Sequence, residues 1–129
     1  MASQPSKSPL RILIIEDEET LLSVLTEKLR KAGYDVKTAL DGESGYAMAK
    51  SEKPDLILLD LLLPKKHGIQ ILSEMREDPA LSKIPTIVIS NSGQPVEVEQ
   101  ILALGAKDYL VKANFTPAEV LEKVEKWIG

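Results

Sequence analysis

Cysteine is absent from this 129-residue chain, which also has one histidine, one tryptophan and one phenylalanine. Without cysteine the chain has neither a disulfide framework nor a thiolate metal site, which is consistent with the reducing cytoplasm. The single His67 has no second histidine or any cysteine to share a metal with, so we assign it no function.

Long hydrophobic runs and an excess of positive charge are also missing. The longest apolar stretch, residues 56–63, is interrupted by Asp60 and is far shorter than the roughly 20 residues that span a membrane. The N-terminal residues lack the apolar run of a signal peptide. The net charge of −4 disfavours binding to nucleic acid or anionic lipid, which requires uncompensated Lys and Arg. We therefore expect no direct nucleic-acid partner, no membrane partner and a cytoplasmic location.

The remaining composition is that of one globular domain, with 43% hydrophobic and 28% charged residues. Residues 1–9 are rich in Ser and Pro and are predicted to be a flexible tail, and residues 10–129 are predicted to form the domain. Five short apolar runs alternate with stretches of helical period, a pattern typical of βα units on a parallel sheet. Three runs are continuously apolar, as central strands should be, and two are shorter and suit the edges. The predicted central strands are 11–15, 56–59 and 86–89, and the outer ones are 36–39 and 109–111.

The helical segments have recognisable ends. Gly33 can end the first helix, Pro79 stops the third at about residue 77, and Gly105 can close the fourth, whose predicted buried face is Val98, Ile101 and Leu102. The last helix begins at Thr116-Pro117-Ala118-Glu119, a capping box with proline at the first helical position. Its predicted buried stripe is Val120, Leu121, Val124, Trp127 and Ile128. These elements predict a doubly wound α/β three-layer sandwich of flavodoxin-like (βα)5 type with strand order 2-1-3-4-5, and a functional crevice at the carboxyl ends of the strands.

Polar residues occupy that predicted edge: Glu16, Asp17, Asp60, Ser90 and Lys112. Each by itself is typical of a helix cap or a solvated loop. Together they indicate a site, because two carboxylates 4 Å apart repel by about 4 kcal/mol at an effective dielectric near 20. Such a cluster needs a cation, and an all-oxygen ligand set favours Mg²⁺.

Four motifs carry a resemblance to a known family. They are Ile-Leu-Ile-Ile-Glu-Asp-Glu at 12–18, Asp-Leu-Ile-Leu-Leu-Asp-Leu-Leu-Leu-Pro at 55–64 followed by Gly68, Ile-Val-Ile-Ser at 87–90, and Gly-Ala-Lys-Asp-Tyr-Leu-Val-Lys at 105–112. In order and spacing they resemble the receiver domain of two-component response regulators, over residues 10–128. The resemblance implies that Asp60 accepts a phosphoryl group from a histidine kinase or a phosphotransfer protein.

The resemblance also implies roles for the neighbours of Asp60. Asp17 would bind Mg²⁺ directly, Glu16 through water, and Leu62 through its backbone carbonyl. Lys112 and Ser90 would bind the phosphoryl oxygens.

For signalling, the resemblance implies that Tyr109 is the aromatic switch, whose side chain turns inward when the phosphoryl group is bound. The face formed by the fourth helix, the fifth strand and the fifth helix would then bind a downstream protein, and a phosphorylation-dependent homodimer is compatible with it. The domain would not be an enzyme. Since no output domain is recognised, output is expected from a partner or from a part of the parent protein missing here.

The sequence departs from the family pattern at three places. Glu16 stands where an aspartate is usual, a conservative change for a residue acting through water. Lys112-Ala113-Asn114-Phe115 lacks the usual proline, and because a cis bond before Ala113 would cost about 3 kcal/mol, we predict a trans peptide. Asn91 is bulkier than the usual small residue and is expected to narrow access to the phosphoryl site.

Two other classes of protein fit the sequence less well. An aspartate-dependent phosphatase typically has a second acid two residues after its nucleophile, where this chain has Leu62. A docking module descended from a receiver would normally have lost the acceptor or the lysine, and this chain has both Asp60 and Lys112.

Overall fold

A computed structural model describes residues 9–63, 65–91 and 95–129. Five parallel strands form one sheet in the order β2-β1-β3-β4-β5, which confirms the predicted topology. The predicted tail lies almost wholly outside the described residues. The strands are β1 (Arg11–Ile15), β2 (Asp35–Ala39), β3 (Leu56–Asp60), β4 (Thr86–Ser90) and β5 (Asp108–Val111). The helices are α1 (Glu19–Lys31), α2 (Gly42–Glu52), α3 (Gly68–Glu77), α4 (Pro95–Ala103) and α5 (Pro117–Ile128), with a 3₁₀ turn at Lys112–Asn114.

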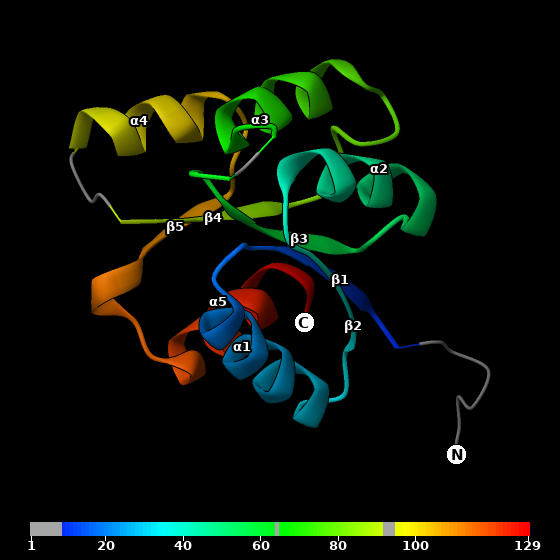
Figure 1. Cartoon of the computed structure of the whole chain (residues 1–129), viewed down its shortest axis with the longest axis vertical. Helices are drawn as coiled ribbons and strands as arrows, with labels where there is room; N and C mark the ends of the chain where they lie inside the picture. The colour runs from blue at the N-terminus through cyan, green and yellow to red at the C-terminus, as the bar shows by residue number, and fades with distance from the viewer. Residues whose placement is uncertain (1–8, 64, 92–94) are drawn as a thin grey trace.

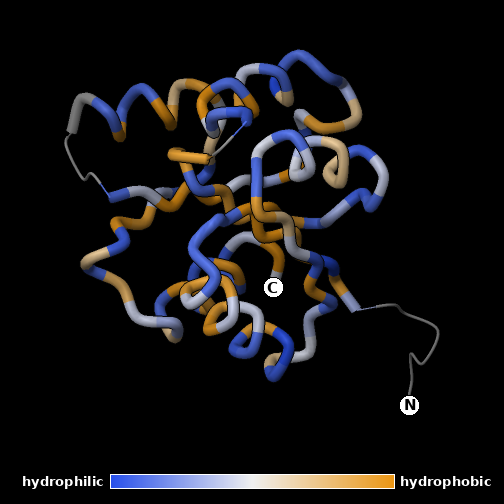
Figure 2. The backbone as a smooth tube through the Cα atoms, viewed as in Figure 1, coloured by the Kyte–Doolittle hydropathy of each residue, from blue (hydrophilic) through white to orange (hydrophobic). Residues whose placement is uncertain are grey.

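The elements form three layers, with α2, α3 and α4 on one face of the sheet and α1 and α5 on the other (Figure 1). Successive side chains of a strand point to opposite faces, so the interior positions of each central strand must be apolar on both faces. In β1, Leu13 and Ile15 pack toward α2–α4, whereas Ile12 and Ile14 pack toward α1 and α5. The hydropathy pattern in Figure 2 accordingly shows the apolar residues gathered in the middle layer.

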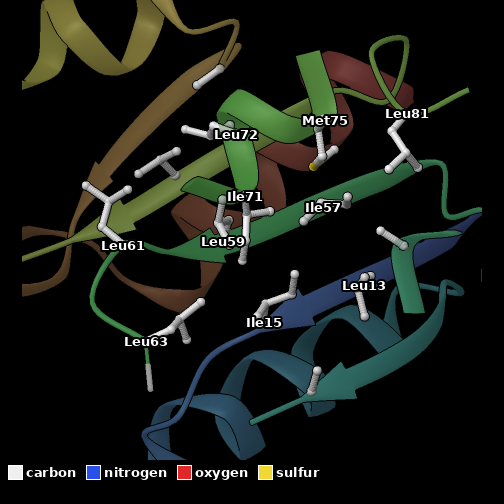
Figure 3. Close-up of a cluster of buried hydrophobic side chains, with 14 of the residues drawn as sticks. Leu13, Ile15, Ile57, Leu59, Leu61, Leu63, Ile71, Leu72, Met75 and Leu81 are labelled. Atoms are coloured by element: carbon white, nitrogen blue, oxygen red, sulfur yellow. The ribbon is translucent and has the colours of Figure 1, made fainter. Parts of the chain in front are cut away.

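The core beneath α3 also anchors the chain after β3. Figure 3 shows Leu61 and Leu63 in the same buried cluster as Ile71 and Leu72 of α3. Leu62 between them points outward and is 62% exposed. The two buried leucines thereby hold the start of the β3–α3 loop against the core.

Predicted helix ends agree with the structure. Thr116 accepts a hydrogen bond from the backbone N–H of Glu119, whose side chain accepts one from the N–H of Thr116. Gly33 and Gly105 have φ values of +101° and +105°, in the region that glycine enters most readily. The Lys112–Ala113 peptide is trans, as predicted, because the described residues contain no cis bond.

One prediction about packing was wrong. Ile101 of α4 is fully buried, but Leu102 is 43% exposed and does not belong to the buried face. Adjacent residues of a helix lie about 100° apart around its axis, so a helix that covers the sheet edge with Ile101 turns Leu102 toward solvent.

The stripe of α5 is confirmed, with Val120 and Val124 buried and the other three members packed against them. None of the helices in these three stretches is long and apolar enough to cross a membrane.

Candidate metal and phosphoryl site

The strand register brings the predicted site together. Ile15 of β1 lies opposite Leu59 of β3, so the next residues, Glu16 and Asp60, emerge side by side. Asp60 lies opposite Ile89 of β4, which places Ser90 at the same edge. Glu16, Asp60 and Ser90 are 0%, 3% and 4% exposed, while Asp17 is exposed. The carboxylates of Glu16 and Asp60 are therefore both buried at the carboxyl edge of the sheet.

Lys112 directly follows the carboxyl end of β5 and bridges these two carboxylates. Its Nζ donates to Glu16 Oε2 at 3.1 Å and to Asp60 Oδ2 at 3.3 Å. It also lies 3.7 Å from Oε1 of Glu18. Lys112, 96 residues from Glu16 along the chain, thus supplies an ammonium to the acidic pair, and its side chain is only 14% exposed.

The pKa values of Glu16, Asp60 and Lys112 are all shifted by their burial beside one another. Burial raises the pKa of Glu16 to about 7, with the charge of Asp60 adding to it and the Glu18 backbone N–H and Lys112 opposing it. Burial also raises the pKa of Asp60, against the charge of Lys112. Burial acts to lower the pKa of Lys112, but hydrogen bonds and charges from Glu16 and Asp60 outweigh it, and the pKa is raised. One ammonium therefore does not fully compensate the two buried carboxylates.

The arrangement fits a divalent cation. Carboxylate oxygens of Glu16, Asp17 and Asp60 lie within 4.8 Å of one another. Glu16 Oε1 is buried and has no hydrogen-bond partner among the described residues, although Lys112 Nζ lies 3.1 Å from it. Buried oxygens normally have partners, so this oxygen is available to a metal or its water. Asp60 Oδ1 accepts a hydrogen bond from the N–H of Leu62 at 3.3 Å, which fixes the backbone beside the site.

Ser90 and Tyr109 meet at a residue that sequence reasoning missed. Glu97 of α4 accepts hydrogen bonds at the same Oε1 from Ser90 Oγ at 3.3 Å and from the Tyr109 hydroxyl at 3.2 Å. Burial raises the pKa of Tyr109, the neighbouring Ser90 side chain opposes this shift, and Glu97 adds to it. The phenol is thus held as a donor. In sequence, Glu97 is indistinguishable from an acid in the first turn of a helix, which the helix dipole favours.

The β3–α3 loop is fastened to the start of α2. Lys65 Nζ lies 4.0 Å from Asp41, and Lys66 pairs with Glu74 at 2.7 Å while its ammonium stands 4.4 Å from the ring centroid of Tyr46. A Cβ on Gly42 would overlap the carbonyl oxygen of Lys66. The loop beside the acidic site is therefore positioned by a close backbone contact.

Two other expectations remain untested by this geometry. Asn91 is exposed, and its predicted effect on access is still a prediction. Pro64 of the second motif lies outside the described residues.

Comparison with known proteins identifies the family. Residues 12–125 match the model of the response regulator receiver domain. The chain is 38% identical over 115 residues to the alkaline phosphatase synthesis transcriptional regulatory protein PhoP of Bacillus subtilis, covering 89% of this chain and 47% of PhoP. It is 37% identical over 102 residues to protein PilH of Pseudomonas aeruginosa, covering 79% of this chain and 84% of PilH. The chain therefore spans about half of PhoP but most of PilH.

Solved structures agree in fold. A putative response regulator from Chloroflexus aurantiacus superposes with a TM-score of 0.84 at 30% identity, covering 92% of this chain and 96% of that one. The receiver domain of the sensor histidine kinase PA1611 from Pseudomonas aeruginosa, which has a magnesium ion coordinated in its active site cleft, also gives a TM-score of 0.84 at 30% identity, with 94% and 98% covered.

The chain belongs to the receiver domains of two-component response regulators. It is a signalling domain of phosphorelay signal transduction. The acidic cluster is compatible with metal binding.

Proposed function

We propose that this receiver accepts a phosphoryl group on Asp60. The observation that carries the proposal is a carboxylate buried at the end of the central strand β3, with Lys112 Nζ 3.3 Å from Oδ2. In the transfer, a carboxylate oxygen of Asp60 attacks phosphorus while the bond from phosphorus to the donor breaks. The donor is a histidine kinase, a phosphotransfer protein or a small acyl phosphate, and the product is an aspartyl phosphate.

Magnesium is the proposed cofactor. Asp17 and Asp60 would hold it directly, Glu16 through water, and Leu62 through its carbonyl, the last assigned from the family pattern. An all-oxygen ligand set suits such an ion, and so does the buried Glu16 Oε1, which accepts no hydrogen bond from the described residues. When bound, Mg²⁺ supplies positive charge to the phosphoryl oxygens.

Lys112 and Ser90 would bind the oxygens of the transferred group. The Lys112 ammonium already lies between Glu16 and Asp60 and is raised in pKa, so it remains charged at neutral pH. Phosphoryl transfer depends mainly on positioning and on cations around the equatorial oxygens, and these side chains supply both. The domain assists only its own phosphorylation and dephosphorylation and is not an enzyme acting on other substrates.

Output is proposed to pass through the face built by α4, β5 and α5, where Tyr109 is the switch. A downstream protein would bind this face, and a second phosphorylated copy is an alternative occupant. We expect the protein to act in the cytoplasm without direct contact to nucleic acid or membrane.

The test is labelling with acetyl phosphate and Mg²⁺, read by intact mass. The parent is expected to gain one phosphoryl group and Asp60→Asn none. Asp55→Asn is the matched control, because Asp55 precedes the opposite end of the same strand and accepts a hydrogen bond from the backbone of Arg11. It should label like the parent. Labelling of Asp60→Asn at the parent's level would refute the acceptor assignment.

A further inference from the structure

One carboxylate of α4, that of Glu97, contacts the edge of the phosphoryl site. Ser90 ends β4 at the crevice, and Tyr109 lies on β5, the neighbouring strand. Both hydroxyls donate to Oε1 of Glu97, at 3.3 and 3.2 Å. Hence one carboxylate oxygen of α4 accepts hydrogen bonds from Ser90, which is expected to contact the phosphoryl group, and from Tyr109, which is expected to act as the switch.

A hydroxyl carries one proton. While that proton is directed to Glu97, it cannot be donated to a phosphoryl oxygen on Asp60. A carboxylate is also a stronger acceptor than a neutral group, since hydrogen bonds to ionised partners are roughly twice as strong. Binding of the phosphoryl group by Ser90 must therefore compete with Glu97.

We infer that Glu97 is a positioning residue that holds the Ser90 hydroxyl and the Tyr109 hydroxyl on α4 in the unphosphorylated domain. The inference rests on the proposed phosphorylation of Asp60 and adds a residue through which the switch acts. When Ser90 turns its proton to the phosphoryl group, α4 loses one of its two hydrogen bonds to the sheet at Glu97. The state of Asp60 is thereby transmitted to the first turn of α4.

The experiment measures binding of beryllofluoride, a phosphoryl analogue, to the full chain in saturating Mg²⁺ by titration calorimetry. Glu97→Ala is expected to bind it about three- to tenfold more tightly than the parent, the range that one net hydrogen bond supplies. Glu99→Ala is the matched control, because Glu99 is an exposed acid on the same helix. It should stay within about twofold of the parent.

Two further variants separate positioning from simple charge. Glu97→Gln removes the charge but keeps an acceptor oxygen, so its affinity should lie between those of the parent and Glu97→Ala. In a Ser90→Ala background, Glu97→Ala should change the affinity by less than about twofold, because position 90 no longer carries a hydroxyl proton that Glu97 could withhold from the phosphoryl group.

Hydrogen exchange of α4 gives an independent readout. In the parent, beryllofluoride should accelerate amide exchange in α4, and in Glu97→Ala exchange should already be fast without it. Unchanged or weaker binding by Glu97→Ala, or an equal gain in the Ser90→Ala background, would overturn the inference. If the parent fails to bind beryllofluoride and is not labelled by acetyl phosphate, the proposed function itself fails, and the two results are distinguishable.

Discussion

Individual carboxylates in this protein have very different environments. Glu16 and Asp60 are buried beside one ammonium, and the pKa of each is raised. Asp108 of β5 is satisfied differently: its Oδ1 accepts from Lys123 Nζ at 3.0 Å and its Oδ2 from Trp127 Nε1 at 3.1 Å. Burial acts to raise the pKa of Asp108, but these hydrogen bonds outweigh it and the pKa is lowered. The negative charge of Glu16 and Asp60 is not fully balanced by Lys112, and a bound cation can supply the missing positive charge. Asp108 is fully paired and connects α5 to the sheet.

The lowered pKa of Asp108 predicts a pH-dependent contribution to stability. A depressed folded-state pKa gives stability that is present above the ordinary aspartate pKa and is lost as the pH falls through the folded-state value. Asp108→Asn should therefore cost about 1–2 kcal/mol at pH 7, and the cost should shrink below about pH 4. Urea unfolding at a series of pH values measures it.

A substitution on the same helix is the control for that series. Glu122 of α5 is exposed, so Glu122→Gln should change the free energy of unfolding by less than about 0.5 kcal/mol at every pH. A loss in Asp108→Asn that is the same at pH 3 and pH 7 would show that the charge of Asp108 is not what stabilises the contact.

At the scale of elements, the start of α2 packs against the backbone of the β3–α3 loop at Gly42. A methyl group at Gly42 would overlap the backbone carbonyl of Lys66, and a backbone atom cannot rotate away as a side chain can. We expect Gly42→Ala to lower the free energy of unfolding by about 1–3 kcal/mol, despite the gain of up to about 1 kcal/mol in helix propensity. Urea denaturation provides the measurement.

The neighbouring position allows a matched comparison. Glu43 is the next residue of α2 and is exposed, so Glu43→Ala changes the same helical turn without entering the contact. It should stay within about 0.5 kcal/mol of the parent. If Gly42→Ala is as stable as Glu43→Ala, the close approach to Lys66 does not constrain the loop.

At the scale of the whole molecule, metal binding should couple to global stability. The buried pair of carboxylates repels in the metal-free fold, so Asp60→Asn should raise the melting temperature in chelator by about 2–8 °C. Magnesium should stabilise the parent more than the variant, because a ligand that binds only the folded state adds stability with concentration. Thermal melts in chelator and in Mg²⁺ measure both effects.

Sodium chloride at matched ionic strength controls for screening, and Asp55→Asn controls for the loss of an aspartate elsewhere. The control variant should respond to Mg²⁺ like the parent. If the parent and Asp60→Asn melt together in chelator and gain equally from Mg²⁺, Glu16, Asp17 and Asp60 do not form one metal site.

Much of the architecture follows from local pattern. Continuous apolar runs at 11–15, 56–59 and 86–89 require strands covered on both faces, and the helices between them require parallel connections. The central position of these three strands then follows, together with the edge at which Glu16, Asp60 and Ser90 appear. The capping box at Thr116 and the glycine after α1 are equally local, because their partners lie within a few residues.

Contacts between different elements were decided by the tertiary structure alone. The pairing of Glu97 with Ser90 and Tyr109, the contact of Gly42 with Lys66, and the exposure of Leu102 depend on how each helix is rotated against the sheet. That rotation is set by packing of the whole core, so a residue's period along the chain does not specify it. The sequence alone therefore determined which residues reach the crevice, and the fold decided which partners hold them there.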